Sequence, residues 1–181
     1  LFPQSNNLIE EGEVLMVTQN NHLVPLTNGD FVKVLQLGEK STKANLHFQN
    51  ARVQHLDTNA EYEIKIALDP FVNFAPNLTP DQQRNLMIEF ARSMRKKKYS
   101  SKSKNYHDAM MKDSYLNSLR ASYGYVVTCH KAQGGEWKDV FLFLDAKMYG
   151  NLNTDSLRRW WYTAITRTKE NLHLHNGWWL S

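Results

Sequence analysis

Side chains that can bind a phosphate or a sugar are crowded into the segment from Val126 to Trp137. After a short apolar stretch come seven residues that suit such binding: Thr128, His130, Lys131, Gln133, Gly134, Gly135 and Glu136. Hydroxyl, imidazole, ammonium and carboxylate groups supply hydrogen bonds and charge, and glycines let backbone N–H groups approach a ligand closely. This combination is typical of phosphate and ribose recognition, and few structural needs explain it.

A second candidate lies in the segment from Trp160 to Lys169, where Arg167 follows a pattern that predicts a helix. A guanidinium group donates to two phosphate oxygens at once, and its charge offsets the negative charge that builds up during phosphoryl transfer. An isolated arginine at a helix end is usually a solvated salt-bridge partner. The residues around Arg167 decide between these two interpretations.

The two segments resemble the last two motifs of superfamily 1 helicases, which usually read T-x-H-K-x-Q-G-x-E-[FW] and Y-x-A-[IL]-T-R-[AT]. The RecD/TraI-like branch is the most similar, because Val14–Asn21 and Thr27–Asp30 resemble its strand and N-G-D turn. The resemblance implies an ATP-dependent DNA helicase that binds ATP and Mg²⁺ between two RecA-like domains. This chain would carry part of the second domain.

The same resemblance assigns roles at the nucleotide. It implies that Arg167 reaches the γ-phosphate of ATP and is the catalytic arginine of the site. Gly134 and Glu136 match residues that line the nucleotide, with Glu136 near the sugar. Gly135 stands where serine or another small residue is common in the family, and we infer no loss of function from that difference.

For DNA, the resemblance implies that Thr128 and His130 touch the phosphate backbone, which suits a hydroxyl and an imidazole at the end of a strand. A hydrogen-bonded pair at a domain edge is the structural alternative. For Lys131 the resemblance implies a role toward nucleic acid or nucleotide. Cys129 and His130 do not form a catalytic dyad, because neighbouring residues on a strand point to opposite faces.

The expected fold class is α/β, with a partial RecA-like parallel sheet, an inserted SH3-like β-barrel and a helical segment. Residues 1–30 and 120–181 would form the RecA-like helicase domain, and the Asn28–Asp30 turn would lead from its sheet into the barrel. Residues 31–78 would form the barrel, because short alternating runs predict half-buried antiparallel strands. They are Phe31–Leu35, Ala44–Phe48, Ala51–Leu56 and Tyr62–Leu68.

Residues 79–119 would form the helical and basic segment. Thr79-Pro80 and Gln82 predict a capped helix start, and a weaker helix is expected over Tyr106–Leu119. The run from Arg95 to Lys104 is strongly basic, and it is either a solvated loop or a phosphate-binding surface.

Near the C-terminal end, alternating strands and helices predict a parallel sheet. Tyr123–Cys129, Val140–Asp145 and Leu172–His175 are the expected strands, and Asp155–Thr166 is the expected helix. The helical spacing of Trp160, Trp161 and Tyr162 favours core packing over stacking on bases.

Composition limits the class of protein. The 181 residues are 41% hydrophobic and 22% charged, with a net charge of +4, which suits one soluble domain or one domain that carries an insertion. No apolar run is long enough for a membrane span. The single Cys129 excludes an internal disulfide and a multi-cysteine zinc site, and it favours a cytoplasmic location. His173 and His175 lack further ligands, so we expect no metal held by this chain alone.

No G-x-x-x-x-G-K-[ST] motif occurs, so the loop that cradles phosphates is not in this sequence. The chain opens at Leu1 without a methionine, and we expect a fragment that neither hydrolyses ATP nor unwinds DNA alone. Its expected partners are single-stranded DNA and an N-terminal RecA-like domain. Two alternatives stay open: a non-catalytic nucleic-acid-binding module, and a component of a recombination or repair nuclease such as an exonuclease complex.

Overall fold

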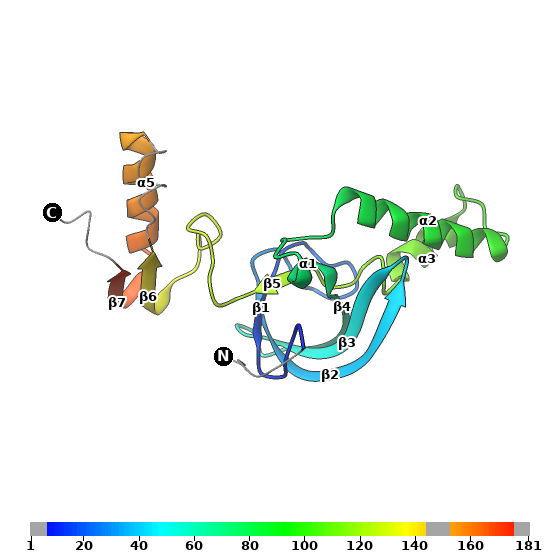
Figure 1. Ribbon diagram of the computed structural model, residues 1–181, viewed down its shortest axis with the longest axis horizontal. Coiled ribbons are helices and arrows are strands. Elements are labelled where there is room, and N and C mark those ends of the chain that lie inside the picture. Colours follow the sequence, from blue (N-terminus) through cyan, green and yellow to red (C-terminus); the bar gives the residue numbers. More distant parts are fainter. Residues whose placement is uncertain (1–6, 144–152, 176–181) are drawn as a thin grey trace. The chain divides into compact units, whose positions relative to one another are not determined.

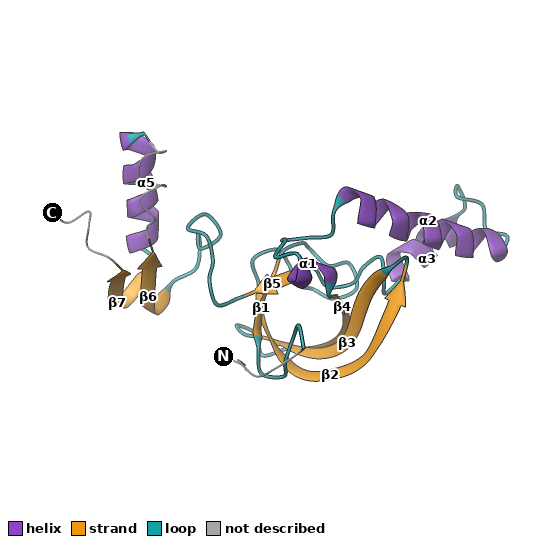
Figure 2. Ribbon diagram, in the orientation of Figure 1, coloured by secondary structure: helices purple, strands orange, loops and turns teal. Residues whose placement is uncertain are grey.

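The computed structural model describes residues 7–143 and 153–175, which belong to two compact units, Leu1–Tyr125 and Val126–Ser181 (Figure 1). Helices and strands occur in both units, so the α/β class is confirmed in this coarse form (Figure 2). None of the helices in the described ranges is long and apolar enough to cross a membrane.

The first unit contains a five-stranded antiparallel sheet in the order β4-β3-β2-β1-β5. Its strands are β1 Val14–Val17, β2 Phe31–Lys43, β3 Leu46–His55, β4 Glu61–Ala67 and β5 Ala121–Tyr123. Irregular pairing interrupts the β2–β3 register at two places, and such bulges bend a sheet (Figure 2). Within the described residues this bent sheet does not close into a barrel.

The expectation of four short strands between Phe31 and Leu68 was wrong, because three strands span this region and the first two are long. Ala44 and Asn45, expected to begin a strand, form the tip of the β2–β3 hairpin instead. Their φ angles are 53° and 58°. Positive φ at both central residues produces the turn whose twist matches that of paired strands.

Alternating burial along the strands builds the core of the first unit. Fully buried side chains include Leu15, Val32 and Val53, and a neighbouring cluster contains Phe48 and Leu86. The second cluster joins the sheet to helix α2, because Leu86 belongs to that helix. Sheet and helix are thus stabilised by a shared apolar contact.

Three helices lie between β4 and β5 along the chain: α1 Asp69–Val72, α2 Pro80–Lys96 and α3 Lys104–Lys112. The predicted start of α2 is confirmed, since Thr79 and Gln82 form a reciprocal capping box. Its apolar side buries Leu86, Phe90 and Met94.

The second predicted helix, over Tyr106–Leu119, was too long. Asp113 leaves the helical conformation, and its side chain accepts hydrogen bonds from the backbone N–H groups of Tyr115 and Leu116 at 2.9 Å. An aspartate that bonds to the next residues in this way favours a turn over a continued helix.

A strand was also expected over Tyr123–Cys129 as part of a parallel sheet, and this was wrong. β5 ends at Tyr123 and pairs antiparallel with β1. β1 and β2 are neighbours in the same sheet, joined through the Asn28–Asp30 turn, where Gly29 has a φ of 103°. The predicted boundary at residue 30 therefore falls inside this sheet, and the wider division into domains stays a prediction.

The second unit is a strand–helix–strand arrangement. β6 Trp137–Phe143 and β7 Thr168–His175 are parallel neighbours, and α5 Thr154–Ile165 connects them. The expected helix and parallel pairing are confirmed here, although both strands begin earlier than predicted. Leu144 and Asp145 lie outside the described residues.

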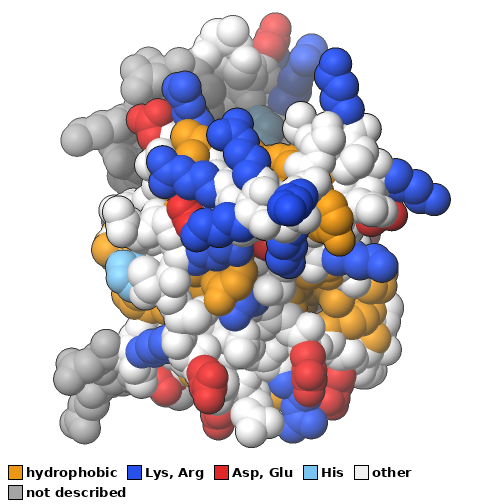
Figure 3. Space-filling view, turned by 90° about the vertical axis from the view of Figure 1, so that its right-hand side faces the viewer, with side chains coloured by type: hydrophobic (Ala, Val, Ile, Leu, Met, Phe, Trp, Pro, Cys, Tyr) orange, Lys and Arg blue, Asp and Glu red, His pale blue; other side chains and the backbone are white. Residues whose placement is uncertain are grey.

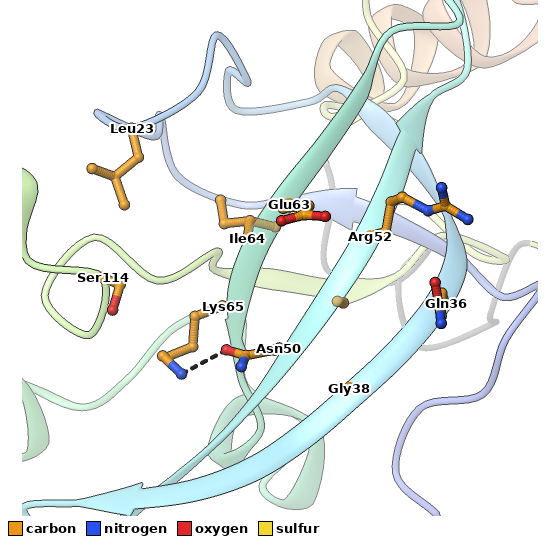
Figure 4. A pocket seen from close by; sticks show the side chains of 10 residues that line it. Leu23, Gln36, Gly38, Asn50, Arg52, Glu63, Ile64, Lys65 and Ser114 are labelled. Carbon is orange, nitrogen blue, oxygen red and sulfur yellow. Dashed lines mark hydrogen bonds between the residues drawn. The ribbon is translucent and has the colours of Figure 1, made fainter.

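A hollow of about 570 Å³ lies on the sheet of the first unit, lined partly by β2, β3 and β4 (Figure 4). Two of its three charged side chains, Lys65 and Arg52, have partners from the same sheet. Lys65 donates to Asn50 Oδ1 at 2.7 Å, and Arg52 pairs with Glu61 at 3.7 Å. These charges are therefore used within the sheet.

Candidate functional site

The residues Thr128–Trp137, here called the motif segment, precede and enter β6 as consecutive turns. Backbone hydrogen bonds run from Ala132 N to Thr128 O at 3.0 Å and from Gly135 N to Ala132 O at 3.2 Å. Ala132 is the residue buried by these turns. The polar side chains are consequently left on the outside, where a ligand can reach them.

Two hydrogen bonds hold the motif segment against α5 Thr154–Ile165 and the residues that follow this helix. The Cys129 thiol donates to the Trp160 carbonyl at 3.5 Å, and Arg167 Nη1 donates to the Gly135 carbonyl at 3.1 Å. Trp160 lies within α5, and Arg167 lies between α5 and β7. The segment is therefore fixed at both ends by the connection that follows β6.

Arg167 is half-buried, and its guanidinium group makes three hydrogen bonds within the unit. Besides the bond to Gly135, Nε donates to the Thr163 carbonyl and Nη2 donates to Thr166 Oγ1, each at 3.1 Å. A guanidinium group has five N–H donors. Two donors thus stay available for a ligand after the contacts within the described residues are satisfied.

The residues assigned to the nucleotide lie next to this arginine along the chain. Gly134 is exposed and has a φ of 87°, and its N–H donates to no group in the described part of the chain. Glu136 is exposed and pairs with Lys169 at 3.8 Å. The bond from Arg167 to Gly135 brings the arginine to the Gly134–Glu136 stretch.

Thr128, His130 and Lys131 lie on the first of the turns, and all three are exposed. Thr128 Oγ1 accepts a hydrogen bond from the Lys131 backbone N–H at 3.4 Å. The hydroxyl therefore helps to form the turn, while the imidazole and the ammonium group are free to face solvent. The structure brings these three residues together only as sequence neighbours.

Cys129 and His130 lie in turns and not on a strand, so the opposite orientation expected of strand neighbours does not apply to them. Cys129 nevertheless lacks the character of a nucleophile. Burial raises the pKa of its thiol, while the charge of Arg167 lowers it by a smaller amount. A reactive thiol needs a lowered pKa.

Sequence reasoning missed several residues that support the site. Thr163 and Thr166 hold the arginine, and Trp137 stacks over Gly135: a side-chain carbon added at Gly135 would lie 2.5 Å from the indole. Thr168 Oγ1 is buried and has no hydrogen-bond partner among the described residues. The run Thr166-Arg167-Thr168 was a visible signal, because hydroxyl side chains flank the arginine.

The expected core packing of the aromatic residues in α5 differs between positions. Trp160 and Trp161 are half-buried and meet edge to face, with ring centres 5.5 Å apart. Tyr162 is 73% exposed. Core packing therefore describes the two tryptophans in part and does not describe the tyrosine.

Comparison with known protein families bears on the part of the chain that contains the motif segment and Arg167. Residues 123–175 match the UvrD-like helicase C-terminal domain. The match supports a UvrD-like superfamily 1 helicase and a helicase-related role in a motor domain. No curated protein matches the chain. The helicase assignment thus rests on most of the second unit and on residues 123–125, which precede it.

Proposed function

We propose that this chain supplies the second motor domain of an ATP-dependent DNA helicase of the RecD/TraI-like branch. The observation that carries the proposal is the family match over residues 123–175, which includes Arg167 beside the motif segment. In this proposal β6, α5 and β7 belong to a RecA-like sheet, and the bent sheet of the first unit is an SH3-like insertion.

The residues present fit the phosphates of ATP. Arg167 keeps two donors, and the N–H of Gly134 is free within the described residues. A half-buried guanidinium and a free backbone N–H suit phosphate oxygens. ATP with Mg²⁺ would supply the phosphoryl group that is transferred to water, and a P-loop domain would hold most of that nucleotide.

In this site Arg167 would orient toward the γ-phosphate and offset its developing negative charge. The bonds to Thr163 and Gly135 would fix the guanidinium before the nucleotide arrives, so that little ordering is needed during the reaction. Gly134 and Glu136 would line the nucleotide next to it. Binding between two domains would link ATP turnover to domain closure.

We further propose that Thr128, His130 and Lys131 contact the phosphate backbone of single-stranded DNA. All three side chains are exposed on one turn, and none of the three is needed to fill a core. Contacts of this kind position a protein on DNA without reading its sequence. Closure of the motor would then move the DNA.

The test uses the longer polypeptide that joins this chain to a P-loop domain. Arg167→Ala should reduce DNA-stimulated ATP turnover by about a thousandfold, as for other arginines that act on a transferring phosphoryl group. Arg159→Ala removes an exposed arginine of α5 and is the matched control. Turnover near the wild-type rate in Arg167→Ala, with the control also unchanged, would refute the assigned role.

A second test uses the 181 residues alone. Because the sequence holds no P-loop motif, the purified chain should show no ATP turnover above background, with or without DNA. Robust turnover by this chain would overturn the proposed division of the active site. Tight DNA binding by this chain alone, together with unchanged ATP turnover in Arg167→Ala of the longer polypeptide, would favour the non-catalytic binding module.

A further inference from the structure

The region from Arg92 to Lys112, at the end of α2 and through α3, concentrates positive charge. It contains eight basic residues and a single acid, Asp108. Its excess of seven positive charges is larger than the net charge of +4 of the entire chain. The remaining residues are therefore net negative, and positive charge is a local property of this region, here called the basic surface.

The charges of the basic surface are exposed and mostly unpaired. Figure 3 shows Lys and Arg side chains gathered on the face that presents α2 and α3. All eight basic side chains are exposed, and only Arg92 makes an ion pair with a described residue, at 3.5 Å to Glu89. Unpaired cations at this density repel one another, so the surface carries an electrostatic cost.

Helix stability explains only part of this charge. Arg95 and Lys96 occupy the last turn of α2, where cations interact favourably with the helix dipole. Lys104 is the first residue of α3, and the first turn of that helix has no acid. A cation at this end opposes the dipole. Stabilisation of α3 therefore does not explain the presence of Lys102 and Lys104.

The fold holds the basic surface in place. The N–H of Tyr99 donates to the Met94 carbonyl at 3.0 Å and that of Lys98 to the Arg95 carbonyl at 2.9 Å, which closes the end of α2. Lys98 adopts a φ of 60°, a conformation that favours glycine. Phe90 and Tyr106 meet edge to face at 5.3 Å and join the two helices.

We propose that the basic surface binds the phosphate backbone of nucleic acid without reading its sequence. This contact would be additional to that of Thr128, His130 and Lys131, and its choice of partner rests on the proposed helicase function. Regularly spaced phosphates match a spread of exposed cations. Tyr99, 38% exposed among the lysines, offers a ring on which a base can stack.

Other polyanions fit this surface less well. Insertion into a membrane interface requires a free apolar helix face, whereas α2 buries Leu86, Phe90 and Met94 within the protein. A protein partner typically needs an apolar or aromatic anchor at the centre of the interface. The basic surface presents mainly ammonium and guanidinium groups, as a backbone-binding surface does.

The experiment compares two double variants of the 181-residue chain with the same change in net charge. Lys102→Glu/Lys104→Glu alters the basic surface and adds an acid at the start of α3, which favours that helix. Lys33→Glu/Lys40→Glu alters exposed lysines of β2 and is the control. Binding to a fluorescent single-stranded oligonucleotide is measured by anisotropy from 50 to 200 mM salt.

We expect the Lys102/Lys104 variant to bind the oligonucleotide on the order of tenfold more weakly near 0.1 M salt. The slope of the logarithm of the binding constant against the logarithm of the salt concentration should be shallower by about 1.4. The control should bind within about twofold of the wild type, because its lysines would contact no phosphate. Circular dichroism should show unchanged helix content in both variants.

Equal losses in the two variants would show a general charge effect and overturn the proposal, as would unchanged binding in the Lys102/Lys104 variant. Binding to phosphatidylserine vesicles that depends on these lysines, without binding to the oligonucleotide, would instead identify a membrane surface and also overturn it. The readout needs no ATP. A failed Arg167 test would thus reject the motor role while leaving a positive result here intact.

Discussion

Arg167 joins a structural role to the proposed catalytic one, because three of its donors bond to Thr163, Thr166 and Gly135. Arg167→Ala should therefore also lower the free energy of unfolding of the second unit, by about 1–2 kcal/mol. Arg159→Ala, an exposed arginine in the same helix, should cost much less. Urea unfolding followed by tryptophan fluorescence would measure both, and equal effects would contradict the structural role.

Thr168 and Thr166 offer opposite tests on either side of Arg167. Thr168→Val removes a buried hydroxyl without a partner in the described residues, and should raise the free energy of unfolding by about 1 kcal/mol. Thr166→Val removes a hydroxyl that donates to the Tyr162 carbonyl at 2.8 Å and accepts from Arg167, and should lower it. Thermal unfolding of the two variants would check these signs. A destabilised Thr168→Val variant would indicate an unseen partner for that hydroxyl.

Glu13 is 7% exposed, and burial raises the pKa of its carboxyl above its ordinary value of 4.5. A raised carboxyl pKa in the folded state means that folding favours the neutral form. The associated stability is present below pH 4.5 and is lost as pH rises through the folded pKa. Glu13→Gln should therefore be more stable than the wild type at pH 7.

The advantage of Glu13→Gln should shrink as the pH is lowered toward 4, because the wild-type carboxyl is then protonated as well. The amide oxygen can still accept the hydrogen bond that the Glu10 N–H now donates to Glu13 at 3.0 Å. Urea midpoints at the two pH values give the comparison. A difference that grows on acidification would show that the sign of the pKa shift is wrong.

At the scale of elements, the capping box of α2 should make a measurable contribution to the free energy of unfolding. Thr79→Ala removes the hydroxyl that accepts from the Gln82 N–H at 3.3 Å, and should cost about 1 kcal/mol of stability in the first unit. Thr79→Ser keeps a cap and should recover most of that loss. A serine variant as unstable as the alanine variant would mean that the methyl group matters more than the cap.

Elements with local signals were predictable from the sequence. Caps and periodic apolar residues placed the start of α2 and the strand–helix–strand of the second unit, since both signals act over a few residues. The prediction of a strand over Tyr123–Cys129 was wrong because pairing with β1 decides where β5 ends. Val126, inside the predicted strand, is 77% exposed. The turn at Ala44-Asn45 was not predicted because it lacks the glycine that usually marks such turns.

The polar side chains of the candidate site could be predicted from the sequence. The backbone groups that hold Arg167 in place could not. Thr128, His130 and Lys131 are exposed, as a ligand-binding role requires. Arg167 is held by the carbonyl groups of Thr163 and Gly135. Every residue has a carbonyl group, so no sequence pattern marks the two that hold an arginine.

For the whole molecule, the two units differ in how much apolar surface they bury. Large side chains such as Phe48, Phe90 and Leu15 are fully buried in the first unit. Among the described residues of the second unit, only Ala132 and Ala164 are buried, whereas Phe141 and Phe143 are at least 60% exposed. Because burial of apolar surface is the main driving force for folding, the second unit should be the less stable one.

Hydrogen exchange followed by mass spectrometry would test this difference. Amides of β6 and β7 should exchange at lower protection than those of β2 and β3 at the same pH and temperature, since their opening costs less free energy. Equal protection of the two strand pairs would contradict the prediction. Added P-loop domain should raise protection in β6 and β7 if the proposed motor assembles around them.

The indole of Trp137 lies where a side chain at position 135 would stand. A side chain at position 135 would therefore require the indole of Trp137 to reorient, or a smaller residue at 137. Crowding is thus expected when a larger residue enters at 135 beside an unchanged Trp137, and not when Trp137 alone is replaced.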